Sequence, residues 1–562
     1  MVLILVFCAL GSTPVGVARA ADTTDYTVRQ VDVYRDVVPD STLPLRYYAA
    51  HPAVPYVGVR PYFERFFDAV LEHTVQGHVH RYTRDKAYME VDATAGIIVW
   101  HDVGTLTAHG GFAEANCRTF WQEQSTSTPL HAKIINLRDY GIDVYAEGDE
   151  VYLPLTLLGN FAGGTAQYNV VYNGQSVYVL DMCGELSPTP RDVAYYGPSY
   201  HHPMERARTP DMAQYAYRLL CLSVDQARGY TRQTLLGDDN LLTLGLDGTL
   251  ETYYPHLKQM LLSTSAKTYH LGLTALFAGL WDGGHTCIVD GAVCNHSALA
   301  EVAAHPELRP TVRAMLQSAV DKQRAKEACA RARQWAWGVA PTQHTYYHCA
   351  SGVAYVGWDA FEVDYRGWDA YYRGEGKVPT DTYAFVRNAL EQARTDGAKH
   401  VVLDLACNGG GDTLALLGVL ALVGDARGTM WVNDVMHRSR TAVGGLADVN
   451  LDGCFDEADA MACRRDYDVS VLTSRYSFSC GNLLPALLQG AGCKTIGERT
   501  GGGGCAISLE ATADGVVYVR SSHLCLCDAR GRGIDEGVEP DVPMPYALCY
   551  DPAQVAEALE ST

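Results

Sequence analysis

Positive charge is scarce in this 562-residue sequence, which contains 44 Lys and Arg residues against 65 Asp and Glu residues. The formal net charge is −21 at pH 7. Nonspecific binding to nucleic acid or to anionic membranes depends on clustered positive charge. The composition therefore disfavours both kinds of partner.

Long apolar runs are also missing. Beyond the N-terminus no run of about 18 or more apolar residues occurs, and a membrane-spanning helix needs about 20. No repeat with a period of roughly 20–50 residues is visible, which argues against a solenoid. We therefore expect a chain without a membrane span.

Cysteine occurs at 17 positions, but no pair has C-x-x-C spacing and no zinc-binding spacing is visible. This is far from the density of a small disulfide scaffold. Cys525 and Cys527 alternate along one expected strand, so both sulfurs lie on one face. The sequence does not say which cysteines pair.

The N-terminus has the pattern of an export signal. Residues 2–10 are apolar, and small residues follow up to Ala18-Arg19-Ala20, a small-x-small cleavage pattern. No positively charged leader precedes the run, and a buried N-terminal strand is the alternative interpretation. We expect residues 1–20 to be a signal peptide and the mature chain, secreted or at the cell surface, to begin near Ala21.

Residues 21–185 are predicted to form a β-rich N-terminal domain. Asn173-Gly174 between two Val- and Tyr-rich runs predicts a hairpin over residues 168–180, because both turn positions favour positive φ. The apolar spacing of residues 61–74 predicts one amphipathic helix. Residues 134–145 with 151–158 resemble the stalk-like modules named after the copper amine oxidase N-terminal domain. The resemblance concerns the fold, since no histidine cluster there suggests copper.

Residues 186–206 are rich in Pro, Gly and Tyr and are interpreted as a linker. A helical subdomain is expected over 207–345, with breaks at Pro306 and Pro310. Strands and helices alternate over 346–550, which predicts an α/β core with a mostly parallel sheet. Residues 551–562 would form a C-terminal tail.

Four segments beside expected strands carry the groups needed for acyl transfer: Asp282-Gly-Gly-His-Thr286, Asp404-Leu-Ala-Cys-Asn-Gly-Gly-Gly411, Ser477-Phe-Ser-Cys-Gly-Asn482 and Gly533-Ile-Asp-Glu-Gly-Val-Glu-Pro-Asp541. A serine at a strand-to-helix turn is exposed where helix amides can stabilise an oxyanion. It needs a neutral imidazole as base, and the imidazole needs a carboxylate to fix its tautomer. Taken singly, each segment also fits an ordinary turn, helix cap or surface loop.

Together with Gly497-Glu-Arg-Thr500, and in this order, the segments resemble those of the C-terminal processing (tail-specific) serine peptidase superfamily, over roughly residues 207–550. The resemblance implies a ClpP/crotonase-like β-β-α core. The tail-specific branch uses a lysine where this chain has the glycines Gly501–Gly504. The pattern is therefore closer to the Ser/His/acid branch, which includes the tricorn core protease and the chlamydial protease-like activity factor.

By this resemblance Ser479 is the nucleophile and His285 the base. The acid is Glu536 as first choice or Asp535 as second. The oxyanion donors are the backbone N–H groups of Cys480 and of Gly410 or Gly411. The glutamate that usually follows the serine turn is Asn482 here.

A calcium loop is predicted at residues 448–459, which fit D-x-[DN]-x-[DN]-G with an acid at the twelfth position. Gly453 would make the sharp turn. The ligands would be Asp448, Asn450, Asp452, the carbonyl of Cys454, Asp456 and Asp459. An acidic surface loop without metal is the alternative.

The sequence thus predicts a secreted serine endopeptidase that acts on a peptide or protein through an acyl-enzyme, with structural Ca²⁺ and no organic cofactor. The alternatives are an inactive exported peptide-binding or surface-interaction protein on the same fold, and an unrelated serine hydrolase. Substrate preference and oligomeric state, including a homo-oligomer, stay open.

Overall fold

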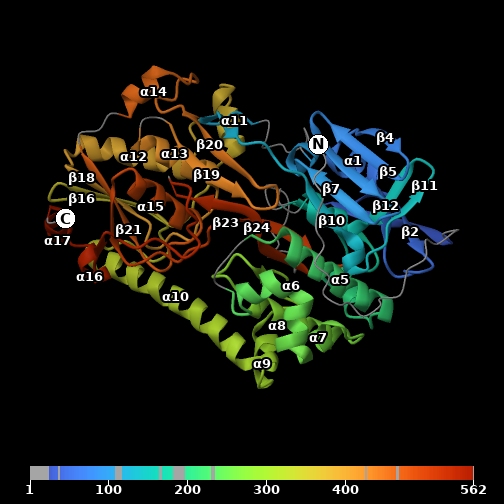
Figure 1. Cartoon of the computed structure of the whole chain (residues 1–562). Helices are drawn as coiled ribbons and strands as arrows, with labels where there is room; N and C mark the ends of the chain where they lie inside the picture. The colour runs from blue at the N-terminus through green and yellow to red at the C-terminus, as the bar shows by residue number, and fades with distance from the viewer. Residues whose placement is uncertain are drawn as a thin grey trace, which may run out of the picture.

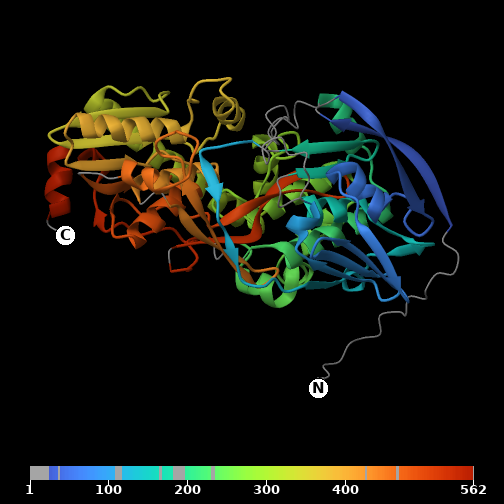
Figure 2. The same ribbon diagram turned by 90° about the horizontal axis from the view of Figure 1, so that it is seen from above.

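The computed structural model describes residues 25–35, 38–107, 117–163, 168–181, 197–229, 234–424, 427–463, 467–528 and 530–560. The expected signal peptide and most of the expected linker lie outside these ranges. Figures 1 and 2 show a β-rich N-terminal part and an α/β C-terminal part side by side, with helices beneath and between them. Within the described residues no helix combines the length and the apolar composition needed to cross a membrane.

The N-terminal part contains two sheets. The first has the strand order β11-β12-β3-β2-β1-β14-β13 and the second the order β10-β7-β6-β5-β4. Their strands are β1 (Tyr26–Arg35), β2 (Val38–Tyr48), β3 (Tyr56–Gly58), β4 (Glu72–Gln76), β5 (Val79–Arg84), β6 (Ala87–Asp92), β7 (Ile97–His101), β10 (Lys133–Asn136), β11 (Tyr145–Glu147), β12 (Glu150–Pro154), β13 (Tyr168–Tyr172) and β14 (Val177–Asp181).

The predicted hairpin is confirmed as β13 and β14, which pair antiparallel with Tyr172 opposite Val177. Its closing bond runs from Asn173 N to Ser176 O, so the tip is Gly174-Gln175, one residue later than predicted. Gly174 takes the positive φ of 97°. Asn173 instead uses its side-chain oxygen to accept from the turn amides.

The predicted helix over 61–74 was too long. Helix α1 (Val59–Phe67) ends where Asp68 adopts a left-handed conformation, φ 47°. The chain then continues as β4, and Val70 is 82% exposed. The apolar positions up to Phe67 pack into the N-terminal core, but Val70 does not extend that buried face.

The helical subdomain lies beneath both parts (Figure 1). Its helices are α5 (Pro210–Ala227), α6 (Asp238–Tyr253), α7 (Pro255–Leu261), α8 (Ala266–Gly279), α9 (His296–Ala304) and α10 (Arg309–Trp337). The break predicted near Pro306 separates α9 from α10, and Pro310 sits in the first turn of α10, where its missing N–H costs no hydrogen bond. Helix α10 runs from α8 and α9 to α16 (Tyr546–Cys549), so it crosses the base of the C-terminal part.

The C-terminal core is the predicted mostly parallel sheet, with the order β16-β17-β18-β21-β22-β25. Only the β16–β17 pair is antiparallel. Its strands and main helices are β16 (Thr345–Ala350), β17 (Val353–Trp358), β18 (His400–Asp404), β21 (Asp468–Thr473), β22 (Lys494–Gly497), β25 (Val542–Pro543), α12 (Thr382–Thr395), α13 (Thr413–Val423) and α15 (Cys480–Gly490). Figure 1 shows α12, α13 and α15 packed around this sheet.

An antiparallel sheet, in the order β15-β24-β19-β20-β8, lies between the two parts. Its members are β8 (Trp121–Glu123), β9 (Thr126–Ser127), β15 (Cys287–Ile288), β19 (Thr429–Asp434), β20 (Ser439–Ala447), β23 (Cys505–Ala511) and β24 (Val517–Cys527). Strand β8, from the N-terminal part of the sequence, pairs with β20, and the nearby Phe120 is buried in the core of the C-terminal part. Figure 2 shows this light-blue segment reaching the orange strands, so the two parts interlock.

Candidate active site

Ser479 stands at the junction between β21 and α15, where it is the N-cap residue of the helix. Its backbone has φ 56° and ψ −121°, a region that residues with a side chain rarely adopt. Such strain costs about 1–3 kcal/mol and clusters at active sites. Its own amide donates to Gly502 O at 3.0 Å, and its side chain is only partly buried. The turn therefore presents the Ser479 hydroxyl at the edge of the parallel sheet.

The hydroxyl groups of the two neighbouring serines form hydrogen bonds to backbone carbonyl groups. The Ser477 hydroxyl donates to Leu405 O at 2.8 Å, and the Ser474 hydroxyl donates to Ala406 O at 2.6 Å. Both side chains are fully buried. Of the three, only Ser479 has a hydroxyl without a hydrogen bond within the described residues.

The glycine run after β18 lies directly against Ser479. A Cβ added at Gly410 would lie 2.6 Å from Cβ of Ser479, so this approach requires glycine. The N–H of Gly410 donates to Asn408 Oδ1 at 2.8 Å, whereas the N–H of Gly411 is not engaged within the described residues. Cys480 starts α15, where the first amides have no partner in the helix, and its sulfur contacts Gly411 O at 3.1 Å.

His285 is buried, 8% exposed, in the loop between α8 and β15. Its ring packs edge-on against Phe478, with the centroids 4.6 Å apart. Burial lowers the pKa of His285 to about 4, and the positive charge of Lys322 acts in the same direction against the carboxylate of Asp282. His285 is therefore a neutral imidazole at neutral pH, as a general base must be.

Phe478 precedes Ser479 in the chain and its ring packs against His285, but no hydrogen bond joins Ser479 to His285 among the described residues. Within the described residues His285 makes no hydrogen bond, and its Nδ1 is buried without a partner. Neither Glu536 nor Asp535 is therefore bonded to the imidazole. Asp535 Oδ1 accepts the N–H of Gly504 at 2.8 Å, and Glu536 lines a nearby cavity.

That cavity has a volume of about 600 Å³ and lies beside the residues Thr500 and Gly501. Its charged lining consists of Asp321, Lys322, Arg475, Arg499 and Glu536. Because Gly501 N donates to Ser477 O, the cavity adjoins the serine turn. It is a polar space beside the turn that carries Ser479.

Lys322 is a functional candidate that the sequence reasoning missed. It projects from α10, and its ammonium group donates to Gly283 O at 2.8 Å, in the loop that carries His285. The same nitrogen lies 3.7 Å from the centroid of Phe478. Burial lowers the pKa of Lys322 to about 8, against the attraction of Asp282 and Asp535. Nothing in the sequence marks this lysine, because it is one of several basic residues on a long helix.

The structure gives a reason for the asparagine at position 482, which the sequence alone left unexplained. Its side chain is fully buried, its Nδ2 donates to Ile534 O at 3.0 Å, and its Oδ1 accepts the Thr500 hydroxyl at 2.6 Å. It therefore joins α15 to the two loops that bring Thr500 and the acidic pair to the site. An amide serves both bonds, since it is a donor and an acceptor.

The predicted calcium loop has the expected turn, with Gly453 at φ 82°. Asp448 and Asp459 are buried, 0% and 1% exposed, and accept hydrogen bonds from loop amides. Asp448 also accepts from Tyr372 OH at 2.9 Å. Asp456 caps the short helix α14 (Glu457–Ala462), while Asn450 and Asp452 accept from the amides of Asp452 and Cys454.

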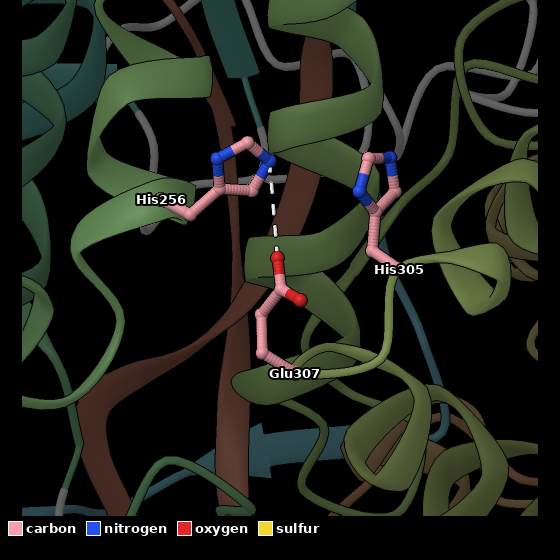
Figure 3. Close-up of side chains that lie close together, drawn as sticks. All are labelled: His256, His305 and Glu307. Carbon is pink, nitrogen blue, oxygen red and sulfur yellow. Dashed lines mark ion pairs between the residues drawn. The ribbon is translucent and has the colours of Figure 1, made fainter.

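Among the described residues, two other groups of three potential ligands have donor atoms that all lie within 4.8 Å of one another, whereas no three carboxylates of the 448–459 loop lie that close together. The first is Asp434, His437 and His523. The second, shown in Figure 3, is His256, His305 and Glu307, where His256 Nε2 and Glu307 Oε1 form a largely exposed ion pair at 3.8 Å. Either group could hold a metal ion, and neither lies in the serine turn.

Comparison with known proteins finds a family whose model matches the segment that contains the serine turn. The model of Peptidase family S41 matches residues 352–544, the range that holds Ser479, the glycine run and the acidic pair. A search of curated proteins finds no significant match.

Solved structures with a likeness to this chain include three with low identities and low TM-scores. A photosystem II D1 C-terminal processing protease is 21% identical, with 38% of this chain and 52% of that chain covered and a TM-score of 0.28. A lipoprotein from Streptococcus agalactiae is 11% identical, with 62% and 96% covered and a TM-score of 0.36. Mature CPAF complexed with lactacystin is 12% identical, with 37% and 52% covered and a TM-score of 0.27.

The chain thus spans about half the length of the first and third of these structures. The family match, not these structures, carries the comparison. Residues 352–544, about a third of this chain, are similar to Peptidase family S41.

Proposed function

We propose that this protein is an exported serine endopeptidase in which Ser479 forms an acyl-enzyme and His285 is the base. The observation that carries the proposal is the Ser479 turn. The serine adopts a strained positive φ at a helix N-terminus, its hydroxyl is uncommitted, and glycine backbone lies against it. Export, supported by the N-terminal apolar run, is part of the same proposal.

In the proposed reaction, Ser479 Oγ attacks the peptide carbonyl carbon and its proton passes to the neutral imidazole of His285. The carbonyl oxygen becomes an oxyanion, for which the amides of Gly411 and Cys480 are the available donors. The protonated imidazole then gives its proton to the leaving amine. Water, activated by the same imidazole, releases the acyl group from Ser479.

This reaction requires His285 to come within hydrogen-bond reach of Ser479. Catalytic hydrogen bonds are often long or poorly aligned in the absence of substrate and tighten in the Michaelis complex. The glycines Gly283 and Gly284, with φ 94° and 142°, precede His285 and give its loop the freedom for such a movement. Either Glu536 or Asp535 would then orient the imidazole.

An inactive exported peptide-binding protein is the second candidate function. The observation that favours it is that His285 makes no hydrogen bond within the described residues. A peptide would then occupy the cavity beside Thr500 without being cleaved. The two candidates differ in a single measurable property, the reactivity of Ser479.

A fluorophosphonate probe tests the proposal, because it labels a serine only when a base activates the hydroxyl. We expect labelling of the full chain at Ser479, loss of labelling in Ser479→Ala, and retention in Ser477→Ala if that variant folds. Digestion of a peptide library then reports cleavage preference. A folded protein that the probe does not label would support the inactive candidate.

We further propose that the 448–459 loop binds Ca²⁺ as a structural ion. The buried carboxylates of Asp448 and Asp459 on either side of a Gly453 turn support this. The ligand set of carboxylate, amide and carbonyl oxygens suits a hard cation. Binding would draw these oxygens closer together than they lie here.

A further inference from the structure

Two cysteines face each other across neighbouring strands close to the active site. Cys505 begins β23 and Cys525 lies near the end of β24, and the two residues are direct partners in the antiparallel ladder. Their sulfur atoms are 3.5 Å apart. We propose that Cys505 and Cys525 are a site of covalent modification, where an intrachain disulfide forms by exchange with a small-molecule disulfide such as oxidised glutathione.

The backbone already suits this bond. Directly opposed residues of an antiparallel pair have Cα atoms roughly 4.5–5.5 Å apart. Disulfides span Cα separations of about 4.4–6.8 Å. The ladder is irregular between Cys505 and Ile507, which leaves the Cys505 end of β23 less tightly fixed by sheet pairing. A disulfide can therefore form through movement of the two sulfur atoms, while the two strands stay paired.

The two thiols differ in access, which sets the order of the exchange. Cys525 is partly exposed, whereas Cys505 is 2% exposed. The contact with Cys525 and the burial raise the pKa of the Cys505 thiol well above its usual value. The reagent therefore meets Cys525 first, and Cys505 acts as the resolving thiol.

The exchange balances in two steps. The Cys525 thiolate attacks one sulfur of oxidised glutathione, forms a mixed disulfide and releases one glutathione thiolate. The Cys505 thiolate then attacks the Cys525 sulfur and releases the second glutathione thiolate. The two cysteine protons end on the two released thiols, so the protein pair is oxidised by two electrons and the glutathione disulfide is reduced.

The bond would fix the segment that borders the proposed active site. Cys505 follows Gly504, whose N–H donates to Asp535 Oδ1 at 2.8 Å and whose carbonyl accepts from Leu526 N at 2.6 Å. Two residues earlier, Gly502 O accepts the amide of Ser479. A disulfide would tie this glycine run to β24. The inference does not depend on whether Ser479 is catalytically active.

The full chain, reduced and then incubated natively with oxidised glutathione, tests the proposal. Remaining thiols are alkylated, the protein is digested without reduction, and linked peptides are identified by mass spectrometry. We expect a peptide pair joined through Cys505 and Cys525, two hydrogens lighter than the sum of its parts. We also expect a higher melting temperature than that of the reduced protein, because a cross-link restricts the unfolded chain.

Cys527→Ser is the matched control, because Cys527 lies two residues along the same strand and its sulfur contacts Cys525 O. This variant should keep both the cross-link and the rise in melting temperature, whereas Cys505→Ser should lose both. Three results would overturn the proposal: both thiols alkylated after oxidation, a link from Cys525 to Cys527, or glutathione retained on Cys525. Each is read on the wild-type protein, so the result does not depend on how a variant folds.

Discussion

The ammonium nitrogen of Lys322 lies 3.7 Å from the ring centroid of Phe478, the residue that precedes Ser479. The imidazole of His285 packs against the same ring in a T-shaped arrangement. Gly503 also lies against the Phe478 ring, since a Cβ added at Gly503 would lie 2.6 Å from it. Phe478 is therefore the ring against which Lys322, His285 and Gly503 all pack.

Replacing Ser479 should remove peptidase activity without unfolding the protein. Ser479→Ala loses only an uncommitted hydroxyl, so we expect no detectable hydrolysis of a casein-like substrate and an unchanged melting temperature. Ser477→Ala removes a buried hydroxyl that accepts from Ser474 N and donates to Leu405 O, so it should lower the melting temperature. Activity that persists in Ser479→Ala would mean that another serine carries the reaction.

The activity should depend on pH through His285. The imidazole accepts a proton only when it is neutral, and its pKa is lowered to about 4. Activity should therefore persist through neutral and mildly acidic pH and fall as the pH drops through about 4. His285→Ala should reduce kcat by several orders of magnitude, because members of a triad act as a unit. Full activity in His285→Ala would rule out the triad.

Lys322 should set the position of this acidic limb. Its positive charge contributes to the lowered pKa of His285, so Lys322→Met should raise that pKa and move the acidic limb to higher pH. Lys326→Met is the matched control, since Lys326 lies one turn further along α10 against Tyr476 and is not among the charges that shift His285. The measurement is kcat as a function of pH. If the acidic limb lies at the same pH in the wild type and in Lys322→Met, the charge of Lys322 does not set the pKa of His285.

The two acids can be separated by isosteric replacement. If Glu536 orients His285, Glu536→Gln should lower kcat by less than His285→Ala does, with KM little changed. If Asp535 is the orienting acid, Asp535→Asn will show the larger loss instead. Because Asp535 also holds the Gly504 amide, the melting temperature of each variant should be recorded beside its kinetics.

Chelation should destabilise the protein if the 448–459 loop binds calcium. A ligand that binds only the folded state stabilises it by mass action, so removing Ca²⁺ should lower the melting temperature. Asp452→Ala should abolish this sensitivity, and since Asp452 is exposed, the change should cost little stability without metal. The same melting temperature with and without chelator would show that the loop is an acidic surface turn.

Asn482 should matter for stability. Asn482→Ala would leave the buried Thr500 hydroxyl without its acceptor, and Ile534 O would keep only its bond from Gly537 N, a loss of about 1–3 kcal/mol in the free energy of unfolding. Asn388→Ala, at an exposed position on α12, is the control. A melting temperature as high as that of the control would mean that the two loops hold their positions without Asn482.

Residue patterns along the chain, and the order of its motifs, were enough to predict the core sheet and the likeness to a peptidase family. The alternation of strands and helices over 346–550 predicted the mostly parallel sheet that the structure has, because a helical crossover joins neighbouring parallel strands. The order of the glycine, serine and acidic segments predicted a resemblance to the C-terminal processing serine peptidases, and the model of Peptidase family S41 matches residues 352–544. Both results rest on residues close together in the chain or on motifs read in sequence order.

Only the tertiary structure determined the contacts between residues that are far apart in the chain. Lys322 reaches Phe478 only because α10 crosses beneath the parallel sheet, and a helix pattern does not specify which neighbour its charged residues meet. Asn482 gains its role from two loops that follow it in the chain, and Cys505 gains a partner from the register of β23 on β24. Such contacts are set by packing and register across the whole fold, so the sequence could supply the side chains but not their partners.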